Sequence, residues 1–299
     1  MRNKLINKKV IIIAEGCDNH FGKLSNAKKM VLQAKKSGAD VIKFQHHIPD
    51  EEMLKKVPKS KNFTLSLYEF LKKYSLSIDD HKKVMLFCKK QKIEYLCTPF
   101  SYKAAAELNS IGVKWFKIGS GEFTDVPFVK KILKFNKPVI FSTGMSTKQE
   151  INMMCKIFKS QKNNKLALMN CTSEYPPKFE DINLKFILEL KKKYPKMIIG
   201  HSDHTNTITT SLGAVALGAR IIEKHVYLNN LNSGPDRDVS ISFSQLATLV
   251  KQIRNMELAL GAKKKIYKKE IAIRKWALRS VVSIKDINKT THKNNPPLP

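Results

Sequence analysis

The chain has 299 residues, a length that suits one large α/β domain or a barrel of about 250 residues with a tail. It contains no run of 18 apolar residues, which excludes a membrane-spanning helix. The net charge of +30 admits nucleic-acid or membrane binding. We interpret it instead as compositional bias, because only 6 of the 55 basic residues are Arg, which specific nucleic-acid contacts favour.

The N-terminus and the cysteines indicate a cellular compartment. Residues 1–9 are polar and basic, and the apolar run Val10–Ala14 is too short for the core of a signal peptide. The five cysteines are scattered without a CxxC pair, which favours free thiols (Cys17, Cys88, Cys97, Cys155 and Cys171). We therefore expect a cytoplasmic protein.

Strand-like and helix-like segments alternate along the chain. Eight short apolar, β-branched runs predict strands at Val10–Ala14, Asp40–Phe44, Ile93–Cys97, Lys114–Ile118, Pro138–Ser142, Leu166–Asn170, Met197–Gly200 and Arg220–Glu223. Amphipathic stretches predict helices at Leu24–Lys36, Asp80–Lys92, Tyr102–Ile111, Val126–Phe135, Lys148–Lys159, Leu184–Tyr194, Ile208–Leu217 and Ser244–Leu260.

Eight such units predict an α/β fold, a closed (β/α)₈ TIM barrel over residues 1–262. The alternative is an open doubly wound sheet, which normally carries a glycine-rich dinucleotide loop after its first strand. Residues 15–22 occupy that position and do not match GxGxxG.

Two segments fall outside the repeating pattern. The connection from His46 to Ser77 is too long for a plain loop, and its apolar residues predict a short helix over the barrel mouth (Phe63, Leu65, Leu67, Tyr68, Phe70 and Leu71). Residues 263–299 form a basic C-terminal extension with one predicted strand at Ala277–Ile284. Its last residues, Asn294–Pro299, are typical of a disordered end.

Polar side chains follow every predicted strand, at the end where barrel enzymes carry their chemistry. They are Glu15, Lys43, Gln45, Thr98, Lys117, Ser120, Glu122, Ser142, Thr143, Asn170, Thr172, Ser173, Ser202, His204, Glu223 and His225. This regularity indicates an enzyme.

The charged residues among them divide by chemistry. Lys43 and Lys117 follow apolar runs, so we expect both to point into the barrel and, with Ser120, Ser142 and Ser202, to bind a phosphate or carboxylate. The alternative is that the lysines are solvated surface residues. Three carboxylates, at Glu15, Glu122 and Glu223, are candidate acids, bases or partners of cations. Asp236, after Gly234-Pro235, either reaches over the site or is a turn residue.

His204 and His225 lie 21 residues apart, about one βα repeat. This spacing places two imidazoles at the ends of neighbouring strands, which predicts a divalent metal site. The alternative is a pair of structural histidines. A metal beside an anion site suits condensation or lyase chemistry at a carbonyl, because the metal can polarise the carbonyl oxygen.

A set of ordered motifs across residues 10–262 resembles the N-acetylneuraminate (sialic acid) synthases. The motifs are Ala14-Glu15…Asn19-His20-Phe21-Gly22, Lys43-Phe44-Gln45, Thr98-Pro99-Phe100, Lys117-Ile118-Gly119-Ser120-Gly121-Glu122, Ser142-Thr143-Gly144-Met145, Cys171-Thr172-Ser173-Glu174-Tyr175-Pro176, Ser202-Asp203-His204-Thr205, Glu223-Lys224-His225 and Gly234-Pro235-Asp236. Synthases of legionaminic and pseudaminic acid share most of them.

The resemblance implies a reaction and a set of ligands. Phosphoenolpyruvate condenses with the aldehyde of an N-acylated amino sugar, N-acetylmannosamine in the type case, to give a nine-carbon 2-keto acid and phosphate by C–O cleavage. The metal would be Mn²⁺, or another divalent ion such as Mg²⁺, held by His204 and His225. The implied phosphoenolpyruvate ligands are Lys43, Thr98, Lys117, Ser120, Ser142 and Ser202.

The remaining implied roles belong to the sugar and to protons. Tyr175 and Asp236 would contact the sugar, and Glu15 and Glu122 would position water and move protons. Glu223 would orient a cation or the metal-bound water. Which glutamate acts as the base stays open.

The C-terminus departs from the resembled pattern. Family members carry an antifreeze-like domain that is swapped across a homodimer, and residues 280–287 resemble only its opening. We therefore expect a homodimer without a complete swapped domain. There are two alternatives to a sialic acid synthase. The chain is a synthase of legionaminic or pseudaminic acid, or it is an impaired homologue that needs a separate C-terminal domain. A third interpretation is an inactive binding protein.

Overall fold

The computed structural model describes residues 9–56, 65–160, 166–229 and 236–286. Eight parallel strands form one sheet in the order β3, β2, β1, β8, β7, β6, β5, β4. Their bounds are β1 (Ile11–Glu15), β2 (Val41–His46), β3 (Glu94–Pro99), β4 (Phe116–Ile118), β5 (Val139–Ser142), β6 (Leu166–Cys171), β7 (Ile198–Asp203) and β8 (Ile221–Tyr227).

The two ends of this sheet also meet. Strand β4 lies against β3, and beside it the indole Nε1 of Trp115 donates a hydrogen bond to the carbonyl oxygen of Tyr95 over 3.0 Å. The strands therefore close into a barrel, which is the predicted (β/α)₈ fold. The short β9 (Ile241–Ser242) pairs with the end of β8.

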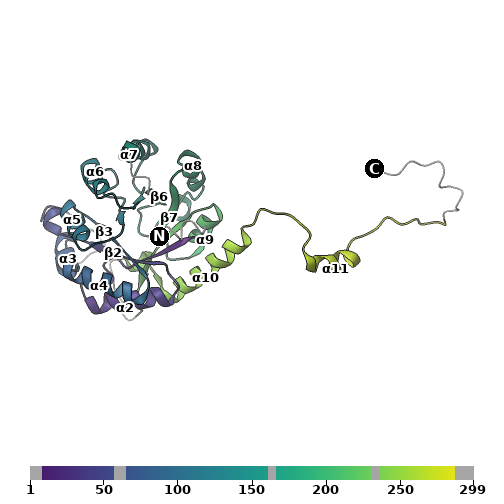
Figure 1. Cartoon of the computed structure of the whole chain (residues 1–299), viewed down its shortest axis with the longest axis horizontal. Helices are drawn as coiled ribbons and strands as arrows, with labels where there is room; N and C mark the ends of the chain where they lie inside the picture. The colour runs from purple at the N-terminus through teal and green to yellow at the C-terminus, as the bar shows by residue number, and fades with distance from the viewer. Residues whose placement is uncertain (1–8, 57–64, 161–165, 230–235, 287–299) are drawn as a thin grey trace. The chain divides into compact units, whose positions relative to one another are not determined.

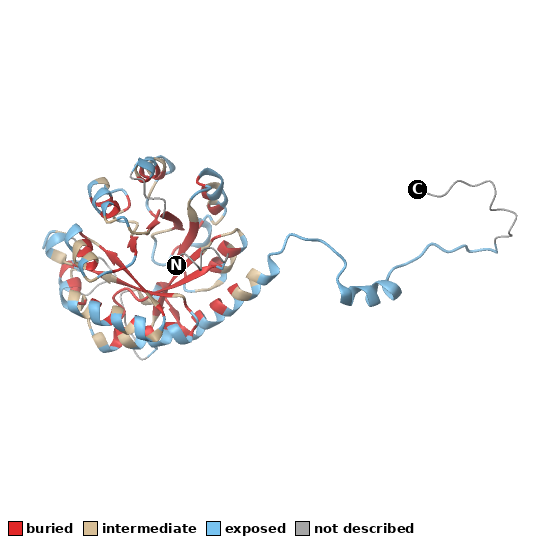
Figure 2. Ribbon diagram, in the orientation of Figure 1, coloured by how far each residue is buried: buried red, intermediate tan, exposed pale blue. Residues whose placement is uncertain are grey.

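Helices surround the barrel (Figure 1). Their bounds are α2 (Leu24–Lys36), α3 (Leu67–Tyr74), α4 (Ile78–Gln91), α5 (Tyr102–Ser110), α6 (Val126–Lys134), α7 (Lys148–Ser160), α8 (Phe186–Lys193), α9 (Thr209–Ala216) and α10 (Phe243–Ala259). Apart from α3, each lies within two residues of a helix predicted from the amphipathic pattern. Figure 2 shows why the pattern is informative, since the inner faces of the helices are buried and the outer faces exposed.

The long connection after β2 contains α3, which confirms the predicted short helix there, although Phe63 lies outside the described residues. Ser66 and Glu69 form a capping box that fixes where α3 begins. The helix packs through Tyr74, whose ring meets the Phe21 ring edge-on at 5.6 Å. It therefore packs against the loop between β1 and α2.

The barrel interior is apolar at the amino ends of the strands and polar at their carboxyl ends. The interior apolar cluster is Ile11, Ile13, Val41, Leu96, Trp115, Ile140, Ala167, Met169 and Ile221. Strand side chains alternate between the two faces, so Glu15 follows Ile13 inward and Lys43 follows Val41. A larger apolar cluster fills the space between strands and helices, so the polar interior side chains rest on rigid supports.

The strands β7 and β8 run further than predicted. The apolar pattern predicts that these strands end at Gly200 and Glu223. In the structure their pairing with each other continues to Asp203 and Lys224. The apolar pattern marks only the part packed in the core, while the backbone ladder extends through the polar residues beyond it.

Residues 261–299 form a unit separate from residues 1–260. Its described residues, 261–286, are exposed and contain the helix α11 (Lys268–Ala277). The predicted strand at Ala277–Ile284 is wrong, because Ala277 ends this helix and residues 278–284 have no strand structure. A β-branched run forms a strand only where another strand satisfies its backbone groups. The predicted disordered end, Asn294–Pro299, lies outside the described residues.

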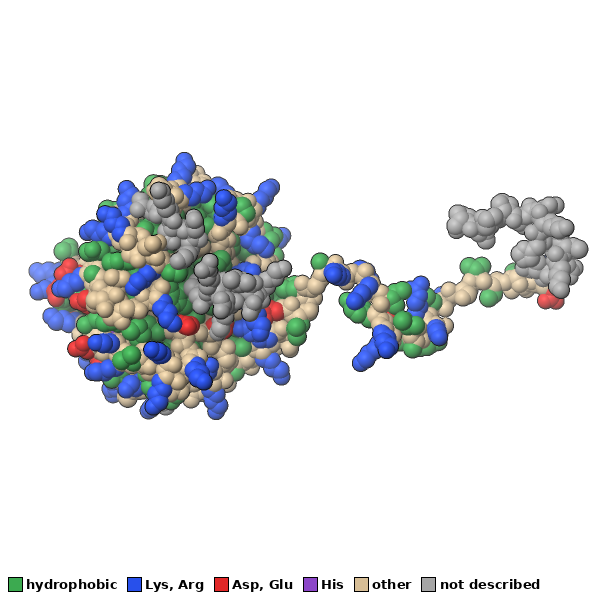
Figure 3. All heavy atoms as spheres, viewed as in Figure 1, with side chains coloured by type: hydrophobic (Ala, Val, Ile, Leu, Met, Phe, Trp, Pro, Cys, Tyr) green, Lys and Arg blue, Asp and Glu red, His purple; other side chains and the backbone are tan. Residues whose placement is uncertain are grey.

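Surface charge and thiols agree with the composition. Lys and Arg side chains are spread over the visible face of the barrel rather than gathered in one patch (Figure 3). All five cysteines are free, as predicted, and all are buried. In the part of the chain that the structure describes, no helix has the length and apolarity needed to cross a membrane.

Candidate active site

A cavity of about 250 Å³ opens at the carboxyl ends of the strands. Eleven of the thirteen residues predicted for the site line it: Lys43, Thr98, Lys117, Ser120, Glu122, Ser142, Tyr175, Ser202, His204, Glu223 and His225. The other two contact residues in the lining. Glu15 Oε2 lies 2.6 Å from Lys43 Nζ, and Asp236 Oδ2 lies 3.3 Å from His225 Nδ1.

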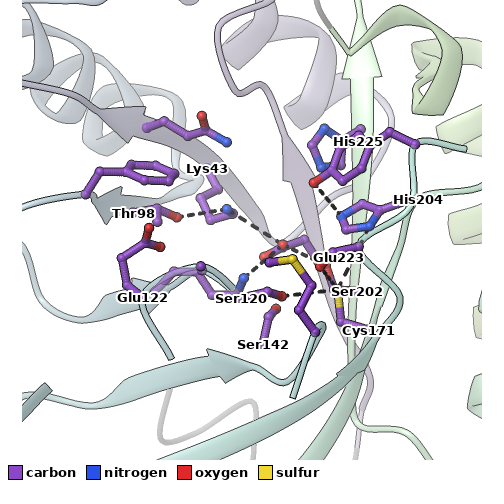
Figure 4. Close-up of a pocket in the computed structure, with 18 residues that line it drawn as sticks. Lys43, Thr98, Ser120, Glu122, Ser142, Cys171, Ser202, His204, Glu223 and His225 are labelled. Atoms are coloured by element: carbon purple, nitrogen blue, oxygen red, sulfur yellow. Dashed lines mark hydrogen bonds and ion pairs between the residues drawn. The ribbon is translucent and has the colours of Figure 1, made fainter. Parts of the chain in front are cut away.

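Strand register explains why residues far apart in the sequence meet in this cavity. Glu15 is paired with Lys43 on one side and with His225 on the other, and Ser202 is paired with Glu223. Paired residues on neighbouring parallel strands project to the same face, so the inward rows form a ring of polar groups. Figure 4 shows Lys43 and Thr98 across the cavity from His204 and His225.

Two lysines and two carboxylates form a buried charged cluster on the cavity floor. Glu223 Oε1 lies 3.2 Å from Lys117 Nζ and 3.7 Å from Lys43 Nζ, and accepts a hydrogen bond from Ser202 Oγ. Burial alone would raise the pKa of Glu223, but Lys117 and Lys43 outweigh burial and hold it below its usual range. The cluster therefore keeps Glu223 ionised near neutral pH.

The two lysines respond differently to burial. Burial would lower the pKa of Lys43, yet Glu15 and Glu223 hold it above its usual range. The pKa of Lys117 is lowered, because burial outweighs the attraction of Glu223. Lys117 is consequently the cation that gains most from a further anion in the cavity, since that anion would offset its lost solvation.

Hydroxyl groups complete one side of the cavity. Ser142 Oγ is buried without a hydrogen-bond partner among the described residues. Ser120 Oγ accepts a hydrogen bond from the Gly144 amide over 3.1 Å. A Cβ atom on Gly144 would lie 2.2 Å from Ser173 Oγ, so glycine is what lets these hydroxyls approach each other. The Ser120 hydroxyl donates to Cys171 Sγ over 3.6 Å, so the Ser142 hydroxyl is the donor most available to a bound phosphate or carboxylate.

Glu122 differs from the other carboxylates of the site. It lines the cavity, and its Oε2 atom is buried with no hydrogen-bond partner in the described structure. Burial raises the pKa of Glu122 to about 7. Glu122 can thus hold or release a proton near neutral pH, which Glu223 cannot do.

The two histidines lie together at the mouth of the cavity. The ring centroids of His204 and His225 are 5.1 Å apart, and Tyr175 stacks on His204 at 4.3 Å. His204 Nδ1 lies 2.7 Å from the Thr172 carbonyl oxygen. A carbonyl only accepts, so Nδ1 carries the proton and Nε2 keeps a lone pair.

These groups fit a divalent metal. His225 Nδ1 is buried and lies 3.3 Å from Asp236 Oδ2, but among the described residues it makes no hydrogen bond of normal geometry. Donor atoms of Cys17, His225 and Asp236 lie within 4.8 Å of one another. Imidazole and carboxylate are common ligands of first-row divalent ions. Asp236 lies at a turn and its carboxylate also contacts His225, so its two predicted placements hold together. Gly234 and Pro235 lie outside the described residues.

Sequence reasoning assigns no role to several other residues of the lining. They are Gln45, Phe100, Met145, Cys171 and Ser173. The period of two in a strand could have identified Gln45, which follows the inward Lys43 by two positions. No comparable pattern identifies Met145, because it lies in a loop.

The comparisons agree with this geometry. The NeuB family profile matches residues 30–265. The chain is 41% identical to the N,N'-diacetyllegionaminic acid synthase of Campylobacter jejuni, over 94% of this chain and 87% of that protein. It is 36% identical to the pseudaminic acid synthase of the same organism, over 95% and 84%.

A solved structure is also similar. The N-acetylneuraminic acid synthetase of Leptospira borgpetersenii in complex with citrate is 30% identical, with a TM-score of 0.80 over 90% of this chain and 92% of that one. Enzymes of the NeuB family use a divalent metal. The chain therefore belongs to the NeuB family of phosphoenolpyruvate-dependent nonulosonic acid synthases, which are C–C bond-forming transferases.

Proposed function

We propose that this protein condenses phosphoenolpyruvate with a six-carbon aldehyde sugar that carries two acylated amino groups, giving a legionaminic-type acid and phosphate. Among the compared relatives, the identity of 41% to a legionaminic acid synthase exceeds the 30% to a sialic acid synthetase. This comparison favours the sugar substrate of legionaminic acid synthesis over N-acetylmannosamine, the substrate that the sequence motifs predict.

The buried charged cluster is the observation that carries the proposal. Lys43 and Lys117 both lie within 3.7 Å of one oxygen of Glu223, and Glu15 is a second partner of Lys43, so two cations are held in place on the cavity floor. Phosphoenolpyruvate brings a phosphate and a carboxylate, and buried cations bind such groups strongly when the geometry is fixed in advance. Ser120, Ser142, Ser202 and Thr98 supply the hydroxyl groups around them.

The reaction balances as follows. C3 of phosphoenolpyruvate forms a bond to the aldehyde carbon of the sugar, and the aldehyde oxygen takes a proton. Water adds to C2 of the former phosphoenolpyruvate and loses a proton. The hydroxyl now at C2 loses its proton to become the keto oxygen as the bond between C2 and the bridging oxygen breaks, and phosphate leaves with that oxygen and takes up the proton. The product is a nine-carbon 2-keto acid.

Glu122 is our choice for the proton-carrying residue. A pKa of about 7 makes both protonation states available at neutral pH. Lys117 and Lys43 hold Glu223 ionised, so we assign Glu223 to fixing the two lysines. Glu15, 2.6 Å from Lys43 and hydrogen-bonded to Gln45 over 3.3 Å, positions groups that face the sugar.

The histidine side of the cavity would receive the aldehyde end of the sugar. His204 and His225 would hold a divalent ion such as Mn²⁺ or Mg²⁺, and Tyr175 and Asp236 would contact the sugar beside it. When bound, such an ion supplies a Lewis acid for the aldehyde oxygen. The lone pair of His204 Nε2 and the buried Nδ1 of His225 support this assignment.

Phosphate release from phosphoenolpyruvate tests the proposal. The purified chain is supplied with the diacetamido hexose of the legionaminic series, its pseudaminic isomer or N-acetylmannosamine, each with and without Mn²⁺. We expect the highest kcat/KM with the legionaminic precursor and no release without metal. A higher kcat/KM with N-acetylmannosamine would contradict the substrate assignment. The homodimer and the remnant domain in residues 263–299 stay predictions.

A further inference from the structure

Cys17 occupies an unusual backbone position beside the candidate metal site. It follows β1 directly after Gly16 and has a φ of 34°, in the region that residues with a side chain seldom adopt. A glycine would take this conformation without steric cost. Strain of this kind at a cavity points to a function for the side chain.

The thiol of Cys17 is directed at the end of β8. Cys17 is 1% exposed, and its amide donates to Glu15 Oε1 over 2.9 Å, which fixes the turn. Its Sγ lies within 4.8 Å of a ring nitrogen of His225 and a carboxylate oxygen of Asp236, which are themselves 3.3 Å apart.

The three donors nearly have the spacing of metal ligands. With a metal–sulfur bond of about 2.3 Å and metal–nitrogen and metal–oxygen bonds of about 2.1 Å, tetrahedral ligand atoms lie roughly 3.3 to 3.6 Å apart. Small rotations of the side chains reach this spacing. The Nδ1 atom of His225 is buried and makes no normal hydrogen bond within the part of the chain that the structure describes, which is a second observation that suits a metal-binding role.

Charge balance agrees with this arrangement. One thiolate, one carboxylate and one neutral imidazole carry a total charge of minus two, which a divalent ion cancels. Buried charge is stable only when it is compensated in this way. The thiol proton is displaced to solvent as the sulfur–metal bond forms.

We propose that Cys17 is a thiolate ligand of the divalent metal in this protein, together with His225 and Asp236. A sulfur ligand shifts preference from Mn²⁺, which suits oxygen and imidazole donors, toward thiophilic ions such as Zn²⁺ and Co²⁺. The inference rests on the proposed metal site. It adds two ligands, Cys17 and Asp236, to the two-histidine assignment, and it gives the site a metal preference.

Cobalt substitution tests the ligand without relying on activity. A thiolate bound to Co²⁺ gives a near-ultraviolet charge-transfer band, which imidazole and carboxylate ligands do not give. We expect this band in the cobalt-loaded full chain, its loss in Cys17→Ser, and its retention in the control Cys155→Ser, which changes a buried helix thiol remote from the site. Absence of the band in the unaltered protein would overturn the proposal.

Competition between metals provides the second measurement. Zn²⁺ affinity should fall at least roughly tenfold in Cys17→Ser, with a smaller loss for Mn²⁺. Cys171 is the other thiol near the histidines, 3.9 Å from His204 Nδ1. A band that survives in Cys17→Ser and disappears in Cys171→Ser would assign the sulfur to Cys171 and refute the proposal.

Histidine variants separate this inference from the metal site itself. If His225→Asn keeps full Co²⁺ affinity, the proposed metal site is wrong and the inference falls with it. If His225→Asn loses metal while Cys17→Ser keeps its Zn²⁺ affinity and its band, only the sulfur ligand is wrong. Circular dichroism of each variant shows whether the fold is retained.

Discussion

Replacing Lys224 by methionine should destabilise the barrel strongly. Lys224 and Asp203 face each other across β7 and β8, with Nζ 3.1 Å from Oδ1 and exposures of 0% and 1%. The same carboxylate accepts hydrogen bonds from Thr205, Thr210 and Ser211. Within the described residues, Lys224 is the cation that pairs with Asp203. Methionine removes this positive charge and leaves the Asp203 carboxylate buried in place.

The magnitude follows from burial. Removing one partner of a buried ion pair costs about 3 to 5 kcal/mol, and the hydrogen bonds that remain on Asp203 favour the lower end. For a barrel of this size, a loss of about 3 kcal/mol lowers Tm by roughly 6 to 12 °C.

Thermal unfolding followed by circular dichroism measures the effect. The double variant Asp203→Leu/Lys224→Met removes both charges, so its stability should return to within about 1 kcal/mol of the unaltered protein. A single Lys224→Met variant as stable as the unaltered protein would refute the reasoning from burial.

Four further predictions concern residues of the cavity. His204→Ala should abolish metal-dependent turnover and keep the circular dichroism spectrum, and full activity in it would remove His204 from the metal site. Lys117→Met should raise KM for phosphoenolpyruvate at least tenfold, about 1.4 kcal/mol of binding, while an unchanged KM would remove it from the anion site. In the unaltered protein, kcat/KM should decrease above about pH 7 as Glu122 loses its proton, and this decrease should be absent in Glu122→Gln. If the decrease persists in Glu122→Gln, the proton belongs to another group. Burial raises the pKa of Glu122 to about 7 in the folded protein, so ionising this group costs more in the folded than in the unfolded chain. The free energy of unfolding should therefore fall, by at most about 3 kcal/mol, as pH rises from about 4.5 to 7. Urea titrations should show this decrease in the unaltered protein and not in Glu122→Gln.

The barrel was predictable from sequence because local and global patterns agree. An apolar run such as Val139–Ser142 belongs in the core whichever strand lies beside it, and its following residue marks the mouth. The period of two favours Lys43 and Lys117 inside, and their exposure of 3% each in the structure rules out solvated surface lysines. Each of these inferences needs only local sequence.

What the sequence left open depends on contacts between distant residues. Asp236 is an ordinary turn residue until β8 brings His225 next to it. Cys17 likewise has no local signal, because its backbone conformation and its neighbours arise only when β1 and β8 pair. The strand predicted at Ala277–Ile284 failed for the same reason, because a β-branched run forms a strand only beside a partner strand and the local sequence cannot show whether one is present.

Phosphoenolpyruvate labelled with heavy oxygen at the atom that bridges C2 and phosphorus tests the central claim most directly. The labelled compound is incubated with the diacetamido sugar, Mn²⁺ and the chain as given, and both products are analysed by mass spectrometry. The account predicts a nine-carbon 2-keto acid without label and phosphate with the label, both dependent on the sugar. Label retained in the keto acid, or labelled phosphate formed without sugar, would contradict it.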